Sequence, residues 1–288
     1  MLNTKIATKF LIRPTASKPG QKITILIGIA LSIGAVVTAF PFIWMLTSSV
    51  KPQQESVAYP PTIISRHPTF QFFRELFTQL DFGRYLLNTV GVVLIGFVGL
   101  LFIAMAGYAF AKFEFRGKAQ MFFLVLATMM IPVQVTMIPT YLILSRLKLT
   151  NTLVGIAIPT LVSAFGIFLF RQFMSTLPSE IFEAAKLDGA GEWRTFWQIV
   201  IPMSKPIIAV QAVLTFITGW NSFLWPLIIA NDQNLYTLSV GLSLLNKQIS
   251  ANPSLQMAGA TLMVLPILLV FIIFQRFIVQ GFALSGLK

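Results

Sequence analysis

The sequence predicts an all-α membrane protein in which six helices cross the bilayer. Composition is the first reason: 56% of the 288 residues are hydrophobic and only 10% are charged, whereas soluble domains carry about 25% charged residues. The second reason is that six apolar stretches are long enough to cross a bilayer, for which a helix needs about 20 residues. These stretches are 23–46, 86–110, 121–144, 153–170, 207–230 and 257–274.

The six stretches divide the chain into a short N-terminal tail, 1–22, a six-helix domain, 23–279, and a C-terminal tail, 280–288. The first stretch is too long for a secretory signal peptide, and no cleavage site of small residues follows it. We therefore expect it to be retained as a span.

The longest loop between spans joins the first two stretches and contains one further predicted helix. Thr69 can cap its N-terminus. A helix from there places four apolar residues on one side, which are Phe70, Phe73, Phe77 and Leu80. We expect this helix to lie against the bundle or the membrane interface rather than to contact a partner.

The distribution of basic residues predicts the orientation of the chain. Cytoplasmic loops of membrane proteins carry an excess of Lys and Arg. If the N-terminus is cytoplasmic, 14 of the 21 Lys and Arg residues lie inside, so both termini and the 176–206 loop are predicted to be cytoplasmic. The net charge of +12 then reflects basic loops, and we expect no nucleic-acid partner.

Several kinds of chemistry are disfavoured by what the sequence lacks. It has no cysteine and only one histidine, His67, so we expect no thiolate or histidine metal site and no serine protease-like triad. It has no Gly-x-x-x-x-Gly-Lys-Ser/Thr motif, so it cannot bind ATP in that manner. All nine acidic residues lie in predicted loops, whereas ion-coupled carriers usually keep an ionisable residue within the membrane.

A polar loop, 176–206, separates the fourth and fifth apolar stretches and predicts two short helices. Ser179 can cap the first, with Glu180 in its first turn, where a negative charge suits the helix dipole. Gly189 and Gly191 can end that helix because glycine accepts a left-handed conformation. The second helix is predicted over 192–201, and Pro202 is expected to stop it.

This loop carries a resemblance to a known family. Glu183-Ala184-Ala185, followed by Gly189 and, after nine residues, by Ile199-Val200-Ile201-Pro202, resembles the EAA loop of the membrane subunits of ABC importers. Asp188 and Ala190 fit the carbohydrate-importing, maltose-type branch, while Ile201 departs from the leucine of the family pattern. Segments 49–52, 84–89, 107–113 and 275–281 resemble the same branch.

The resemblance implies a type I ABC importer fold and a division of labour among subunits. Its EAA loop is a coupling helix that docks on an ATPase, which implies this role for Glu183, Ala184, Ala185, Asp188, Gly189, Ala190 and Pro202. The implied partners are a second homologous permease subunit, two ABC ATPase subunits that use ATP and Mg, and an extracytoplasmic solute-binding protein. The chain itself is expected to be a non-enzymatic permease of the plasma (inner) membrane, in contact with lipid and binding no cofactor.

Uncharged polar residues recur along the predicted fifth span at helical spacing. Gln211, Thr215, Thr218, Ser222 and Trp225 fall within an arc of about 80°, and Asn221 flanks it. Hydroxyl and amide groups can replace water around a sugar, but they also join membrane helices, so a pathway and a packing role are both open. On the third span a similar face favours packing, and it consists of Met130, Gln134, Met137 and Tyr141.

The functional hypothesis is a membrane permease subunit that forms half of a translocation pathway for a sugar or sugar-like solute. One alternative is a member of the same family that imports glycerol 3-phosphate or another polar organic solute. A phosphate ester favours basic partners, and no basic residue lies deep in the predicted spans. The alternative from another class is an ion-coupled secondary carrier.

Overall fold

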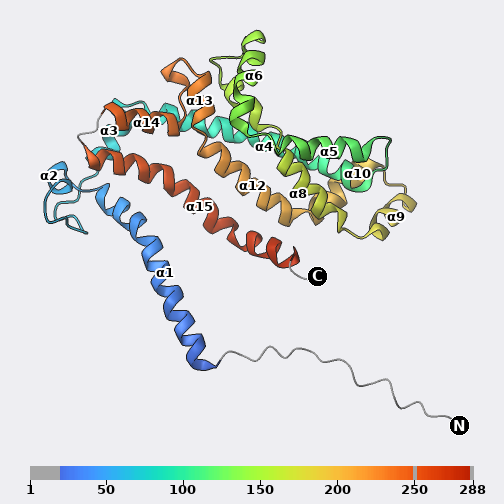
Figure 1. Ribbon diagram of the computed structural model, residues 1–288, viewed down its shortest axis with the longest axis horizontal. Coiled ribbons are helices and arrows are strands. Elements are labelled where there is room, and N and C mark those ends of the chain that lie inside the picture. The colour runs from blue at the N-terminus through green and yellow to red at the C-terminus, as the bar shows by residue number, and fades with distance from the viewer. Residues whose placement is uncertain (1–19, 249–251, 286–288) are drawn as a thin grey trace. The chain divides into compact units, whose positions relative to one another are not determined.

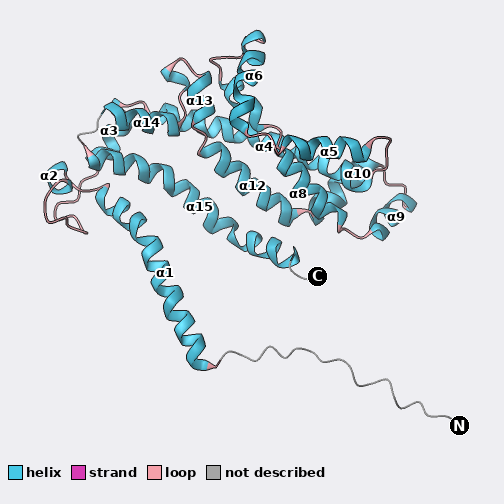
Figure 2. Ribbon diagram, in the orientation of Figure 1, coloured by secondary structure: helices cyan, strands magenta, loops and turns pink. Residues whose placement is uncertain are grey.

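A computed structural model describes residues 20–248 and 252–285, and every regular element in this part of the chain is a helix (Figures 1 and 2). The chain divides into two units, 1–45 and 46–288. The first unit contributes most of α1 (Gln21–Ser48). Lys22–Ser48 has a mean hydropathy of 2.4, which suits a helix that crosses a membrane. The first predicted span is therefore confirmed as a helix long and apolar enough to cross a membrane.

The second unit is built around α4 (Phe82–Lys112), against which α8 (Ala164–Ser175) and α12 (Lys205–Trp220) pack. Glycines let α4 and the fourth span approach closely, because a Cβ on Gly107 would overlap Phe170 and one on Gly99 would overlap the backbone of Leu161. Small residues serve this purpose where membrane helices meet. The close packing leaves Ile103, Phe170 and Met174 buried together.

A third long helix, α15 (Pro253–Ser285), packs on α12 and on α3 (Gln71–Gln79). The Trp220 indole N–H donates to the Met263 carbonyl at 3.0 Å, which ties the end of α12 to α15. Figure 1 places α14 and α9 at opposite ends of the 46–288 unit. The remaining elements of this end of the chain are α13 (Leu224–Ile229), η3 (Gln233–Leu235) and α14 (Leu238–Gln248).

Among the residues that the structure describes, four helices or helix runs are long and apolar enough to cross a membrane, and two bent pairs bring the number to six if each pair is one span. The third predicted span is present as a sharply bent pair of helices. It consists of α5 (Lys118–Thr128) and α6 (Val133–Arg146), which meet at 102°. Pro132 at the start of α6 explains the break, because proline lacks an N–H and disfavours helical conformation in the residue before it. Met130 therefore does not share a helix face with Gln134, Met137 and Tyr141.

The fourth predicted span is interrupted and the fifth is wrong as one helix. The fourth runs through α7 (Leu153–Ala157), η1 (Ile158–Thr160) and α8, and Ser163 accepts a hydrogen bond from Gly166 N–H where α8 begins. The fifth ends at Trp220, and α13 starts only after residues 221–223. Polar side chains stabilise this break, since the Ser239 hydroxyl donates to the Trp220 carbonyl and the Thr237 hydroxyl to that of Ser222.

The helix predicted after Thr69 is present, but it buries a different face. It is α3, and the Thr69 hydroxyl accepts a hydrogen bond from the Gln71 N–H. Phe72 and Leu76 are buried, whereas Phe70 and Phe77 are exposed. The reason is tertiary: the apolar side of this helix is broad, and the part of it that meets α15 and α4 becomes the buried one.

The segment before α3 is held by hydrogen bonds around α2 (Gln53–Ser56). The Glu55 carboxylate accepts from the Thr62 hydroxyl, the Ser65 hydroxyl and the Arg66 N–H at 2.9–3.0 Å. Desolvation raises the pKa of the Glu55 carboxyl, but these hydrogen bonds outweigh it and hold the pKa below its usual range. The carboxylate therefore stays ionised, and this loop keeps its hydrogen bonds, at neutral pH.

Candidate functional site

The 176–206 loop folds into two helical arms. The first is α9 (Ser179–Leu187), and the second runs through α10 (Glu192–Thr195), the π-helical turn η2 (Phe196–Val200) and α11 (Ile201–Met203). Ser179 is the first helical residue rather than the cap, because the extended conformation of Pro178 already ends the preceding segment. Pro202 does not stop the second arm, since its missing N–H is tolerated in the first turn of α11, and the 79° change of direction comes at Ser204.

Gly189 ends the first arm in the manner predicted. Its φ of 74° lies in the left-handed region, which favours glycine. The Gly189 N–H donates to Lys186 O at 3.0 Å, and the Ala190 N–H donates to Ala185 O at 2.9 Å, which is the Schellman pattern. Gly191 does not end this helix, because it has an ordinary φ of −70° and precedes α10. Gly189 alone therefore turns the chain between the two arms.

The two alanines of the loop have different surroundings. Ala185 is buried together with Phe182, which lies one helical turn before it on the same face of α9. Ala184 is exposed, as are Glu183 and Asp188, and Leu187 is 89% exposed. Of the two alanines for which the resemblance implies a docking role, only Ala184 therefore faces outward, whereas Ala185 packs inward with Phe182.

The end of α4 holds both arms of the loop. The Tyr108 hydroxyl donates to a carboxylate oxygen of Glu192 at 3.3 Å. The Tyr108 ring lies 6.3 Å from the ring of Phe182 in α9 and 5.6 Å from that of Phe196 in the second arm, measured between centroids. The Lys112 ammonium donates to Leu177 O at 2.7 Å. The loop is therefore connected to α4 through polar and aromatic contacts.

Sequence reasoning did not find this connection. The 107–113 segment resembles the carbohydrate branch, but this resemblance predicts no contact between the segment and the loop. Tyr108 and Glu192 are separated by 84 residues, so no local pattern pairs them. The available signal was a tyrosine near the basic end of a span, a position that suits an aromatic ring with a polar tip.

The predicted polar stripe is shorter in the structure. Gln211, Thr215 and Thr218 lie on α12, with Gln211 buried, Thr215 half-buried and Thr218 exposed. Ser222 and Trp225 lie beyond the end of α12 and do not continue its face. The Trp225 indole N–H donates to Gly155 O at 3.3 Å, so Trp225 packs against the fourth span. Asn221 is exposed and donates to Ile217 O at 3.1 Å.

Gln211 is the most unusual member of this stripe. Its side-chain carbonyl oxygen is buried and has no hydrogen-bond partner among the described residues. A Cβ on Gly166 would come within 3.1 Å of the Gln211 amide nitrogen, so α8 passes close to this side chain. An unpaired buried carbonyl costs free energy, and a donor hydroxyl or water that reached it would remove that cost.

The bundle of apolar helices, with its two-armed polar loop, defines the chain as a multi-pass membrane protein. Residues 99–283 match the family described as "Binding-protein-dependent transport system inner membrane component". The chain belongs to this family, and it is a multi-pass protein of the inner membrane. Its predicted fold class, a helical ABC importer permease fold, is confirmed.

Named relatives extend this similarity over nearly the whole chain. The arabinooligosaccharides transport system permease protein AraQ of Halalkalibacterium halodurans is 32% identical over 91% of this chain and 96% of its own length. The sn-glycerol-3-phosphate transport system permease protein UgpE of Pectobacterium atrosepticum is 34% identical over 88% of this chain and 93% of its own. A crystal structure of a bacterial ABC transporter involved in the import of the acidic polysaccharide alginate shares the fold, with a TM-score of 0.79 at 23% identity, covering 91% of this chain and 99% of that one.

Proposed function

We propose that this chain forms half of the translocation pathway of an ATP-driven importer for a sugar or sugar-like solute. The other half is a second, homologous permease subunit. Two ATPase subunits hydrolyse MgATP, and an extracytoplasmic solute-binding protein delivers the solute. Both termini and the 176–206 loop lie in the cytoplasm, in keeping with the excess of Lys and Arg on that side.

The observation that carries this proposal is the division of α9 into two faces. One face, with Phe182 and Ala185, is buried, and the opposite side exposes Glu183, Ala184 and Leu187. An exposed apolar side chain beside a small residue offers a ridge and a flat surface to another protein. We infer that this exposed side docks on the ATPase.

The contacts of α4 suggest how movement of the loop reaches the pathway. When the ATPase pair closes on ATP, the loop moves with it. Its first arm, α9, carries Phe182 and its second arm, beginning with α10, carries Glu192, and both residues contact Tyr108. Tyr108 belongs to α4, and α4 packs along α8 and α12. ATP and loaded binding protein thus bias the bundle between inward- and outward-facing states, as in hinge-type gating.

The chemistry of α12 favours a neutral, hydroxyl-rich solute. Beyond Lys205 this helix carries no charged residue, and Gln211, Thr215 and Thr218 offer hydrogen bonds without charge. The similarity to a permease named for arabinooligosaccharides supports a sugar. The similarity to UgpE keeps sn-glycerol 3-phosphate as the second candidate, although its phosphate would then need a basic partner from the sister subunit.

The first prediction concerns the energy source and the partners. A tagged chain purified in mild detergent is expected to bring down a second permease and an ATPase, and the reconstituted complex should take up solute only with ATP. Mutation of the Walker lysine of that ATPase should abolish uptake, whereas an uncoupler should leave it unchanged. Uptake that stops on addition of the uncoupler while ATP is held constant would instead indicate an ion-coupled carrier.

The identity of the solute can be measured on the binding protein that accompanies the complex. A ligand that binds the folded state raises its melting temperature. Arabino-oligosaccharides are expected to raise it, and sn-glycerol 3-phosphate is the matched comparison. A shift caused by the phosphate ester alone would replace the sugar assignment and leave the importer assignment intact.

The second prediction concerns α12. Because the chain has no cysteine, single cysteines at Gln211, Thr215 and Thr218 can be labelled selectively, with Ile217 as the control on another side of the helix. The stripe positions should react with aqueous thiol reagents in at least one nucleotide state. Thr218→Leu should lower uptake affinity about two- to tenfold, since one lost hydrogen bond is worth roughly 0.5–1.5 kcal/mol. Stripe cysteines that are inert with and without ATP would make the stripe a packing surface.

A further inference from the structure

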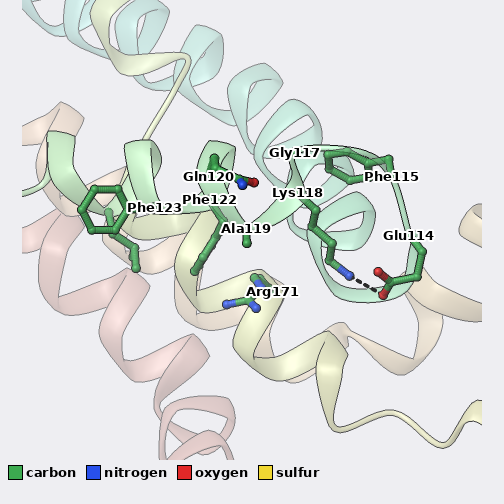
Figure 3. A pocket seen from close by; sticks show the side chains of 10 residues that line it. Glu114, Phe115, Gly117, Lys118, Ala119, Gln120, Phe122, Phe123 and Arg171 are labelled. Carbon is green, nitrogen blue, oxygen red and sulfur yellow. Dashed lines mark hydrogen bonds and ion pairs between the residues drawn. The ribbon is translucent and has the colours of Figure 1, made fainter.

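A cavity of about 670 Å³ lies at the end of the bundle where α4 leads into α5. Figure 3 shows its lining, which comes from the connection between the two helices, from the first turns of α5, and from Arg171 of α8. It is separate from the polar stripe of α12 and from the exposed side of α9. The functional proposal therefore assigns it no role.

Arg171 supplies one positive charge to this cavity. Its Cζ lies 3.8 Å from the centroid of the Phe122 ring, and its Nε donates to Phe110 O at 3.3 Å. A guanidinium carries five N–H donors, and these contacts hold the group in place while using one of them. Among the described residues no carboxylate lies within 4.0 Å of it as an ion pair. Arg171 is thus a fixed cation whose remaining donors suit an anion.

Lys118 supplies a second charge from a different element. Its ammonium is 2.8 Å from the Glu114 carboxylate, but the side chain of Glu114 is 88% exposed while that of Lys118 is only 19% exposed. An ion pair with so exposed a partner contributes little stability, so Lys118 can exchange this carboxylate for another anion. Two cations against one solvated carboxylate leave the lining with a positive charge.

The cavity continues into an apolar surface. Phe115 and Phe123 line it and are also exposed, Phe123 by 68%. On the same helix, Met121 and Leu124 are exposed beside them, and α5 is half of a bent pair apolar enough to cross a membrane. A soluble anion would use only the charged part of this arrangement. A molecule with an anionic head and hydrocarbon tails would use both parts.

We propose that this cavity binds an anionic phospholipid of the phosphatidylglycerol type. The phosphodiester lies between Arg171 and Lys118, and the acyl chains run over Phe115 and Phe123. Basic pockets between helices at the cytoplasmic surface are suited to such head groups. The assignment to the cytoplasmic leaflet rests on the orientation given under the proposed function, whereas the site itself rests only on the geometry of α4, α5 and α8.

Native mass spectrometry of the full chain, purified with its co-purifying subunits, tests the proposal by titration with phosphatidylglycerol and with phosphatidylcholine. Phosphatidylglycerol should bind several-fold more tightly. Lys118→Gln and Arg171→Gln should each weaken it about fivefold, as expected for the loss of one surface cation. Arg116→Gln is the matched control, because Arg116 is an exposed cation of the same connection that does not line the cavity, and it should leave binding nearly unchanged.

Three results would overturn the lipid site. They are equal binding of the two lipids, an equal loss in the Arg116 control, and displacement of phosphatidylglycerol by millimolar inorganic phosphate, which would indicate a site for soluble anions. If Arg171→Gln does not fold, Lys118→Gln alone decides, since the ammonium of Lys118 pairs with Glu114, four residues away in the same segment, rather than with another helix. The readout is lipid retention and not ATP-driven uptake, so failure of this site and failure of the transport function are distinguishable.

Discussion

Replacing Gly189 with valine is expected to uncouple ATP hydrolysis from transport while the membrane helices still fold. Gly189 has a φ of 74°, and a β-branched residue forced into this region costs about 1–3 kcal/mol. An added Cβ meets nothing within 4 Å, so the penalty comes from the backbone alone. The loop avoids it by giving up the Schellman hydrogen bonds, which moves Glu183 and Ala184 relative to the ATPase. Uptake and hydrolysis should be measured together, with and without loaded binding protein.

Gly191→Val is the matched control for this prediction. Gly191 also has nothing within 4 Å of an added Cβ, but its φ of −70° is allowed for any residue. The Gly191→Val variant should therefore retain nearly full coupling between ATP hydrolysis and uptake. Gly189→Asn should retain most of it, because asparagine tolerates the left-handed region better than other side chains. Wild-type uptake by Gly189→Val would show that the turn geometry does not matter, and the coupling role of the loop would lose its geometric basis.

Tyr108→Ala is expected to abolish the response of ATP hydrolysis to the binding protein. The ring of Tyr108 contacts Phe113, Phe182 and Phe196, and its hydroxyl donates to Glu192. Removing a buried aromatic side chain costs about 3–5 kcal/mol, as in other cores, and here much of that cost falls on the attachment of the loop to α4. Basal hydrolysis should continue, because the ATPase is a separate subunit, but uptake should fall at least tenfold.

Tyr108→Phe separates the two contributions of the side chain. It keeps the ring and removes only the hydrogen bond to Glu192, worth roughly 0.5–1.5 kcal/mol, so uptake should fall by no more than about tenfold. Glu192→Gln should behave similarly, and the double variant should be no worse than either single one if the two groups act through one bond. Unchanged stimulation by binding protein in Tyr108→Ala would mean that α4 does not transmit movement of the loop.

Features that depend on local chain chemistry could be determined from the sequence. The apolar stretches at 86–110 and 257–274 predicted helices that the structure contains within α4 and α15, because a run of about 20 apolar residues is stable as a helix in lipid. A glycine turn after the first arm was predictable for a similar reason, since a left-handed residue after a helix is usually glycine, but the choice of Gly189 over Gly191 came only from the structure. The spacing of the EAA-like residues likewise distinguishes this loop from the others in the sequence alone.

Only the tertiary structure decided which faces are buried and where the helices break. Ala184 and Ala185 are adjacent and chemically identical, yet only Ala185 is buried, because α9 is rotated to place it with Phe182 against the rest of the protein. The polar stripe is short because α12 ends at Trp220. The hydroxyls of Ser239 and Thr237 stabilise this end by donating to the carbonyls of Trp220 and Ser222. Tyr108 meets Glu192 across 84 residues. Such contacts arise from the packing of distant segments, and no local pattern in the sequence encodes them.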